Sequence, residues 1–227
     1  MNRPEPESII LQNRVAYGRI AGEWERRQAA DYDHEFHERC RAEFLKHFSG
    51  TRVLDLGCGL GLDSLAFARV GLRVVAADIA VEFLPIVRTK QQSLPVVAAD
   101  MTLPCFRAGA FDGIYAVASF LHVPPELVGR TLAGFARMLA PKGILFLHHV
   151  QASDGCAGYR IDDLLASDNP ALCFCHAPAE LTRMLASEGM RTVAVTGVRP
   201  SRYPSESAAR NGLLPYQLIA LKAEVAE

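Results

Sequence analysis

Residues Arg52–Ala80 read RVLDLGCGLGLDSLAFARVGLRVVAADIA, and the rest of the chain can be interpreted around them. The apolar run Val53–Leu56 contains one acid, which is typical of a strand buried on both faces of a parallel sheet. Glycines fill every second position of the next turn, and apolar residues at helical spacing follow it. A second strand ends at Asp78. We therefore expect one right-handed unit of strand, glycine turn, helix and strand within an α/β fold.

The glycine turn predicts a nucleoside site. Glycine lets the main chain approach a ligand without a Cβ in the way, and the first turn of the helix offers free N–H groups. Asp78 follows the second strand, where a carboxylate can accept from both hydroxyls of a ribose. A dinucleotide fingerprint would need a third glycine at position 62, which is Leu62. This departure argues against a dehydrogenase.

The segment D-L-G-C-G-L-G at 55–61 resembles motif I of the class I S-adenosylmethionine-dependent methyltransferases. Two further segments are similar to that family: G-x-F-D at 109–112 and L-x-P-x-G at 139–143. The resemblance covers roughly residues 15–223 and is strongest at 52–147. It implies a Rossmann-like, doubly wound, seven-stranded and mostly parallel sheet with helices on both faces. It also implies that residues 1–50 form a helical cover of the same domain as 51–227, with a substrate-recognition insertion near 151–176.

The same resemblance implies S-adenosylmethionine as cofactor, with S-adenosylhomocysteine as its product. Tyr17 and Trp24 would close over the cofactor, although ordinary packing of an amphipathic helix is the alternative for both. Asp100 would accept from the adenine amino group, where the alternative is a strand-end cap. The full set of expected cofactor-binding residues is Tyr17, Trp24, Asp55, Gly57, Gly59, Gly61, Asp78, Ile79, Asp100, Met101 and Ala118.

Three histidines at predicted strand ends are the candidate catalytic residues: His122, His148 and His149. Transfer of a methyl group from a sulfonium mainly requires alignment, and a base is needed only when the acceptor must lose a proton. Histidine can serve as that base near neutral pH. Successive side chains of a strand point to opposite faces, so at most one of the two adjacent histidines should face the site. The alternative for each is a pocket wall or a core position.

Arginines in the recognition segments could hold an anionic acceptor through forked hydrogen bonds. The candidates are Arg160, Arg199 and Arg202, with the pair Arg26 and Arg27 in the N-terminal cover as a further possibility. Each of them could equally be an ordinary surface arginine.

Composition narrows the function. The 227 residues carry a net charge of −1, which argues against a long nucleic-acid footprint. Because no window is apolar enough for a membrane helix and the N-terminus lacks a signal-peptide core, we expect a cytoplasmic protein. The cluster Cys173-Phe-Cys175-His176 is too tightly spaced for a standard zinc site, and His34-Glu-Phe-His37 lacks the H-E-x-x-H spacing. We therefore expect no metal, and we expect His37 on a solvated helix face.

The sequence thus favours methyl transfer to a small-molecule acceptor, with oxygen of a carboxylate or hydroxyl as the expected nucleophile. The N/D-P-P-Y/F motif of amino-group methylation is missing, because the fourth predicted strand ends in Ala118-Ser-Phe-Leu. Alternatives left open are an N-methyltransferase of a small molecule, an RNA or protein methyltransferase, and a non-catalytic cofactor-binding protein. The pattern is compatible with a monomer or a homodimer.

Overall fold

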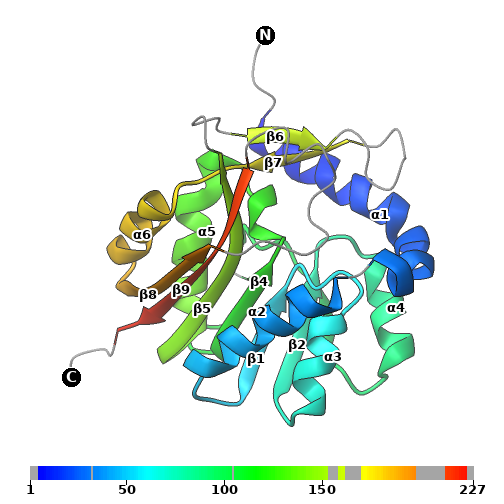
Figure 1. Cartoon of the computed structure of the whole chain (residues 1–227), viewed down its shortest axis with the longest axis horizontal. Helices are drawn as coiled ribbons and strands as arrows, with labels where there is room; N and C mark the ends of the chain where they lie inside the picture. The colour runs from blue at the N-terminus through cyan, green and yellow to red at the C-terminus, as the bar shows by residue number, and fades with distance from the viewer. Residues whose placement is uncertain are drawn as a thin grey trace.

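The computed structural model describes residues 5–31, 33–103, 105–152, 158–161, 170–197 and 213–223. Seven strands form one sheet in the order β3-β2-β1-β4-β5-β9-β8 (Figure 1). The first five pair in parallel, whereas β9 is antiparallel to both β5 and β8. This confirms the predicted seven-stranded, mostly parallel α/β sheet.

The strands of this sheet are β1 (Arg52–Leu56), β2 (Arg73–Asp78), β3 (Val96–Ala98), β4 (Phe111–Val117), β5 (Leu139–Ala152), β8 (Met190–Gly197) and β9 (Leu213–Lys222). The helices are α1 (Pro6–Asp31), α2 (His34–His47), α3 (Leu62–Arg69), α4 (Phe83–Lys90), α5 (Pro125–Met138) and α6 (Pro178–Ser187), with a short 3-10 helix η1 (Phe120–His122) after β4. Among the described residues, no helix combines the length and apolarity that a membrane crossing requires.

Helices cover both faces of the sheet because its strands are apolar on both sides. Val53 of β1 packs with buried side chains of α2, α3 and α4, including Phe44 and Phe67. Its neighbour Leu54 points to the opposite face and packs with α5 and α6. This alternation along one strand creates two separate cores, one on each side.

An ion pair closes the end of the sheet opposite the glycine turn. The Asp112 carboxylate accepts hydrogen bonds from the backbone N–H groups of Thr51 and Arg52 at 3.0 and 2.9 Å. The Arg52 guanidinium also pairs with it and holds the pKa of Asp112 down at about 2. These bonds tie the start of β1 to the start of β4, and so they set the register of the strands that carry the site.

Within the region 151–176 the sequence also predicts a short helix over 161–165, but its first residue, Ile161, lies in a strand. Residues Gly158–Ile161 form β6, which pairs antiparallel with β7 (Ala171–Phe174), and residues 162–165 lie outside the described part of the chain. Pairing with β7 gives β6 backbone partners that a short isolated helix lacks. The β6–β7 hairpin lies beside α1 at one end of the sheet (Figure 1).

Candidate functional site

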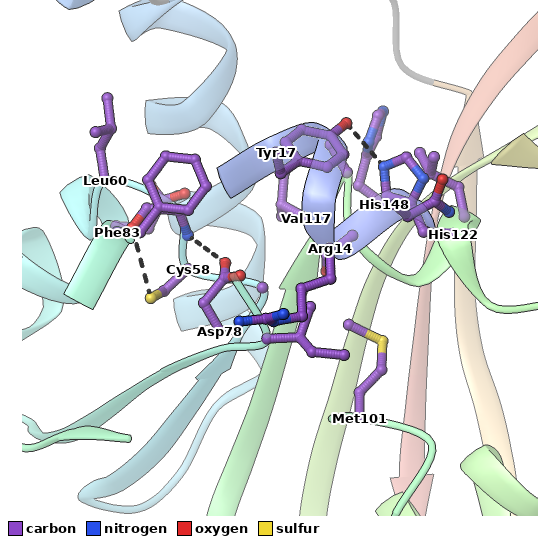
Figure 2. Close-up of a pocket in the computed structure, with 18 of the residues that line it drawn as sticks. Arg14, Tyr17, Cys58, Leu60, Asp78, Phe83, Met101, Val117, His122 and His148 are labelled. Atoms are coloured by element: carbon purple, nitrogen blue, oxygen red, sulfur yellow. Dashed lines mark hydrogen bonds between the residues drawn. The ribbon is translucent and has the colours of Figure 1, made fainter. Parts of the chain in front are cut away.

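A cavity of about 410 Å³, here called the central cavity, lies beside the glycine turn. It is bounded by the ends of β2 and β4 and by side chains of α1 and α2. Ligands of open parallel sheets bind outside the carboxyl ends of the strands, and the central cavity lies at that end of the sheet. Figure 2 shows Cys58, Leu60, Asp78 and Phe83 on one side of it and His122 and His148 on the other.

The turn between β1 and α3 presents bare backbone to the cavity. Gly57, Gly59 and Gly61 all have positive φ, at 72°, 49° and 70°. A Cβ on Gly57 would lie 2.2 Å from the Cβ of Ser119, whereas Gly59 has nothing within 4 Å of the corresponding point. Gly57 and Gly59 line the cavity. The turn therefore offers an open cradle at Gly59 and a tight backbone contact at Gly57.

Asp78 anchors the turn and faces the same space. Its carboxylate accepts from the N–H of Gly59 at 2.9 Å and from the N–H of Ala80 at 2.8 Å. Burial raises the pKa of Asp78 to about 6, although these backbone N–H groups oppose the shift. Each carboxylate oxygen keeps acceptor capacity beyond the single N–H bond it makes. Asp78 can thus accept from a diol while it holds the turn.

The other expected cofactor residues at strand ends also line the cavity: Ile79, Asp100, Met101 and Ala118. One oxygen of Asp100 accepts from both the N–H and the hydroxyl of Thr102 at 2.8 Å, which fixes its direction. Ala118 has a φ of 53°, an uncommon conformation for a residue with a Cβ. This bend turns the chain sharply at the end of β4 and brings Ser119 under Gly57.

Tyr17 and His122 join α1 to the body of the protein. The Tyr17 hydroxyl and His122 Nε2 are 2.8 Å apart, and His122 Nδ1 lies 2.9 Å from the carbonyl oxygen of Leu172. A carbonyl oxygen only accepts, so Nδ1 carries the proton and the neutral ring accepts from Tyr17 at Nε2. Burial lowers the pKa of His122 to about 4, which keeps the ring neutral at pH 7. Trp24 packs against Tyr17 with ring centroids 6.0 Å apart, and all three side chains line the cavity.

Asn13 makes a second link between α1 and β7. Its amide nitrogen donates to the carbonyl oxygen of Leu172 at 2.9 Å, and its amide oxygen accepts from the Leu172 N–H at 2.8 Å. The side chain therefore pairs with the edge of β7 as another strand would. Leu172 thus bonds to both Asn13 and His122, so α1 and η1 are held to the same residue of β7.

We expect Asn13→Ala to destabilise the protein by about 2 kcal/mol, because it removes both bonds and leaves the Leu172 N–H without this partner, although the Leu172 carbonyl oxygen still accepts from His122. Chemical denaturation would measure the loss, and faster amide exchange in α1 would locate it. Gln12→Ala is the matched control, since Gln12 makes only an exposed 3.3 Å bond to the carbonyl oxygen of Pro170. Equal effects of the two substitutions would contradict the role of Asn13.

Three expected site residues lie outside the cavity lining. Asp55 is buried and accepts from the Ser64 hydroxyl at 2.5 Å, and burial raises its pKa to about 8. It therefore ties β1 to α3 behind the turn. Gly61 caps α3, and a Cβ there would meet Val87 at 2.7 Å.

His149 faces the opposite side of β5 from His148 and stacks on His176 with ring centroids 5.4 Å apart. The strand alternation confirms that only one of the adjacent histidines, His148, reaches the cavity.

The expected acceptor-binding arginines are only partly described. Arg160 belongs to β6, where only the backbone is described, and Arg199 and Arg202 lie outside the described residues. Arg26 and Arg27 pair with Glu23 on the surface of α1.

Sequence reasoning missed several polar residues that line the cavity, among them Arg14, His37 and Asp63. Arg14 lies one helical turn before Tyr17, a spacing that places both on one face of α1. Its side chain extends toward Asp78 in Figure 2. His37 was expected on a solvated face, yet it contacts Asp63 of α3. No group of three or more potential metal ligands occurs in the part of the chain that the structure describes.

Comparison with known proteins agrees with this geometry. Residues 54–147 match a family model described as a methyltransferase domain. A ubiquinone biosynthesis O-methyltransferase of Xanthomonas campestris is 38% identical over 103 residues, covering 43% of this chain and 42% of the relative. Another, from Xanthomonas axonopodis, is 32% identical over 163 residues, covering 66% of each. The chain thus spans about two fifths of the length of the first of these relatives.

A solved structure extends the likeness to nearly the whole chain. The 1,6-didemethyltoxoflavin-N1-methyltransferase of Burkholderia thailandensis, crystallised with S-adenosylhomocysteine, superimposes with a TM-score of 0.73 at 19% identity. The match covers 99% of this chain and 93% of that one, and at this identity it supports the fold alone. Residues 54–147 thus carry a methyltransferase domain, and the strand order and the glycine turn are those of the class I, S-adenosylmethionine-dependent fold.

Proposed function

We propose that this protein transfers a methyl group from S-adenosylmethionine to a hydroxyl oxygen of a small, largely apolar acceptor. The observation that carries the proposal is one continuous cavity, with the glycine turn and Asp78 at one side and a mixed apolar and histidine wall at the other. Transfer between two ligands requires that both occupy a single enclosed space in contact with each other.

The residues present fit the cofactor. Asp78 has acceptor capacity for the ribose hydroxyls, Gly59 leaves room for the ligand, and Asp100 and Met101 can take the adenine. Tyr17 and Trp24 supply aromatic surface from α1 above them. When bound, S-adenosylmethionine supplies an electrophilic methyl group on a sulfonium with a neutral thioether as leaving group. The chain's own task is then to orient the acceptor and to exclude water.

The acceptor side favours a small, partly aromatic molecule. Its apolar lining includes Ile10, Phe36, Leu121 and Val123, and α1 and β7 close it through Asn13 and Leu172. An enclosed, mostly apolar pocket with a few polar groups is typical of small-molecule sites. Arg14 also lines this space and could pair with an acidic group on the acceptor. The region 151–176, which contributes β6 and β7, would then determine which acceptor fits.

The choice of oxygen as nucleophile rests on two arguments. The sequence relatives quoted above are named as O-methyltransferases of ubiquinone biosynthesis. In addition, burial lowers the pKa of His148 to about 3, so its ring is neutral, whereas both ring nitrogens of His122 are already bonded to Tyr17 and Leu172. Neutral rings can accept a hydrogen bond from a hydroxyl and so align it with the methyl group. A cavity closed by a helix also leaves little access for RNA or a protein side chain.

The test combines calorimetric titration with product analysis. We expect S-adenosylmethionine and S-adenosylhomocysteine each to bind at one site per chain. Incubation with methyl-labelled cofactor and a panel of phenols, phenolic acids, aliphatic carboxylic acids and amines should then yield alkali-stable aryl ethers. Methyl esters or N-methyl products would contradict the proposed acceptor, and lack of binding by folded, cofactor-free protein would contradict the function.

A further inference from the structure

A histidine and a carboxylate that pair with each other line the central cavity, and they come from α2 and α3 instead of the glycine turn. His37 of α2 places Nδ1 at 2.7 Å from Asp63 Oδ2, and Arg41 pairs with the other oxygen of Asp63. Both His37 and Asp63 line the cavity, with 21% and 10% of their side chains exposed. From this geometry we propose that His37 is the general base that accepts the proton of the acceptor hydroxyl and that Asp63 positions it. This inference rests on the proposed function.

The hydrogen bond determines which ring nitrogen can act. A carboxylate only accepts, so Nδ1 of His37 carries the proton and the lone pair of the neutral ring is on Nε2. Arg41 fixes Asp63 from the other side, so the carboxylate cannot turn away from the ring. A nitrogen base held in one tautomer by a carboxylate is the arrangement that makes histidine an efficient proton acceptor in enzymes.

The ring lies where the two ligands would meet. Asp63 is the second residue of α3, directly after the glycine turn, so it places His37 next to the cofactor side. The ring of Phe36 packs edge-on against both His37 and His148, with ring centroids 5.2 and 4.8 Å apart, so one aromatic ring links His37 to the acceptor side. A base for methyl transfer must reach the acceptor oxygen close to the methyl group, and this is the boundary between the two sides.

The other cavity histidines are less suited to the task. Nε2 of His122 already accepts from the Tyr17 hydroxyl, and its Nδ1 donates to Leu172. His148 exposes only 1% of its surface, and burial together with the nearby charge of His37 lowers its pKa to about 3. A ring that resists protonation this strongly is a poor acceptor for a proton. His122 and His148 therefore orient the acceptor or form the wall, whereas His37 takes the proton.

The acceptor oxygen forms a bond to the methyl carbon as the carbon–sulfur bond breaks, with its electron pair kept by sulfur. At the same time Nε2 of His37 takes the hydroxyl proton, and the resulting imidazolium is stabilised by the carboxylate of Asp63. The proton passes to water when the product leaves. An acceptor that reacts as a carboxylate has no proton to give, and it bypasses His37.

The experiment compares His37→Gln with His47→Gln, which changes another histidine of α2 that pairs with Glu43 away from the cavity. We expect His37→Gln to slow single-turnover methylation of a phenol by about 10²–10⁴-fold. Affinity for S-adenosylhomocysteine should stay within about threefold by calorimetry, and His47→Gln should match the wild type in both measurements. A phenol rate within threefold of wild type overturns the inference and leaves the proposed function standing.

An NMR measurement that needs no turnover tests the inference even if no acceptor is found or if His37→Gln fails to fold. ¹⁵N resonances of the His37 ring in the wild type should report the Nδ1–H tautomer, and Asp63→Asn should shift the tautomer balance toward Nε2–H. Asp63→Glu, which keeps a carboxylate, should restore part of the wild-type signature. A wild-type ring protonated mainly at Nε2 contradicts the inference, whatever the fate of the proposed function.

Discussion

Asp78→Asn is expected to weaken binding of S-adenosylhomocysteine by about 100-fold or more. The carboxylate has capacity for two ribose hydroxyls, and a hydrogen bond to a charged group contributes about 1.5–3 kcal/mol. A 100-fold loss corresponds to about 2.7 kcal/mol. The amide also directs one NH₂ group at the backbone N–H of Gly59 or Ala80, both of which now donate to Asp78. The substitution therefore removes a ligand contact and disturbs the turn that cradles the ligand.

The pH dependence of binding gives this prediction a second readout. Burial raises the pKa of Asp78 to about 6, so the carboxylate gains its charge as the pH rises through that value. Affinity of the wild type should increase from pH 5 to pH 7.5, whereas affinity of Asp78→Asn should not. Glu82→Gln is the matched control, since it neutralises a charge that acts on Asp78 and leaves the acceptor in place. An Asp78→Asn affinity equal to that of the control would remove Asp78 from the site.

The raised pKa of Asp78 acts in the opposite direction on stability: the free energy of unfolding of the ligand-free protein falls as the pH rises. Between the usual carboxyl value of 3.8 and about 6, Asp78 binds a proton in the folded chain and loses it in the unfolded chain. Its contribution to the free energy of unfolding is thus fully present below pH 3.8 and is lost as the pH rises through about 6. On the proposed role of Asp78, the ligand-free protein loses this stability at the pH where the carboxylate gains the charge that would accept from the ribose.

The fold was predictable because its signals are local. The spacing from Val53 to Asp78 specifies strand, turn, helix and strand within one short segment, and the parallel order follows from the handedness of such units. The β6–β7 hairpin was not predictable in the same way. Gly158–Ile161 has few residues and no clear alternation, and its partner strand begins ten residues later. Pairing between short separate segments depends on tertiary contacts that no local pattern encodes.

In the candidate site, too, residues within one local motif could be predicted, whereas contacts between distant segments could not. Asp78 and Gly57 could be placed at the cavity from sequence because their positions depend on the backbone of one motif. His37 could not, because its significance comes from Asp63, which lies 26 residues further along the chain on another helix. His122 shows the converse, since its position was foreseen but its bonds to Tyr17 and Leu172 come from segments distant in sequence.

Gly57→Ala is expected to reduce both stability and cofactor binding severely. Gly57 has a φ of 72°, where a residue with a Cβ costs about 1–2 kcal/mol. The new Cβ would also lie 2.2 Å from the Cβ and 2.9 Å from the hydroxyl oxygen of Ser119. Because that hydroxyl donates to the Leu56 carbonyl oxygen at 2.7 Å, Ser119 cannot move without losing a buried hydrogen bond. We expect a total loss of about 3–5 kcal/mol of unfolding free energy, measured by chemical denaturation.

Gly71→Ala separates the cost of the left-handed backbone from the cost of the close contact with Ser119. Gly71 has a φ of 87° at the end of α3, but a Cβ there would have nothing within 4 Å. It should therefore lose only about 1 kcal/mol, the cost of the left-handed backbone alone, and should bind S-adenosylhomocysteine as the wild type does. The difference between the two variants measures the contact between the glycine turn and Ser119. If Gly57→Ala were no less stable than Gly71→Ala, the close packing of the turn against the end of β4 would have to be abandoned, and with it the physical reason for glycine at position 57.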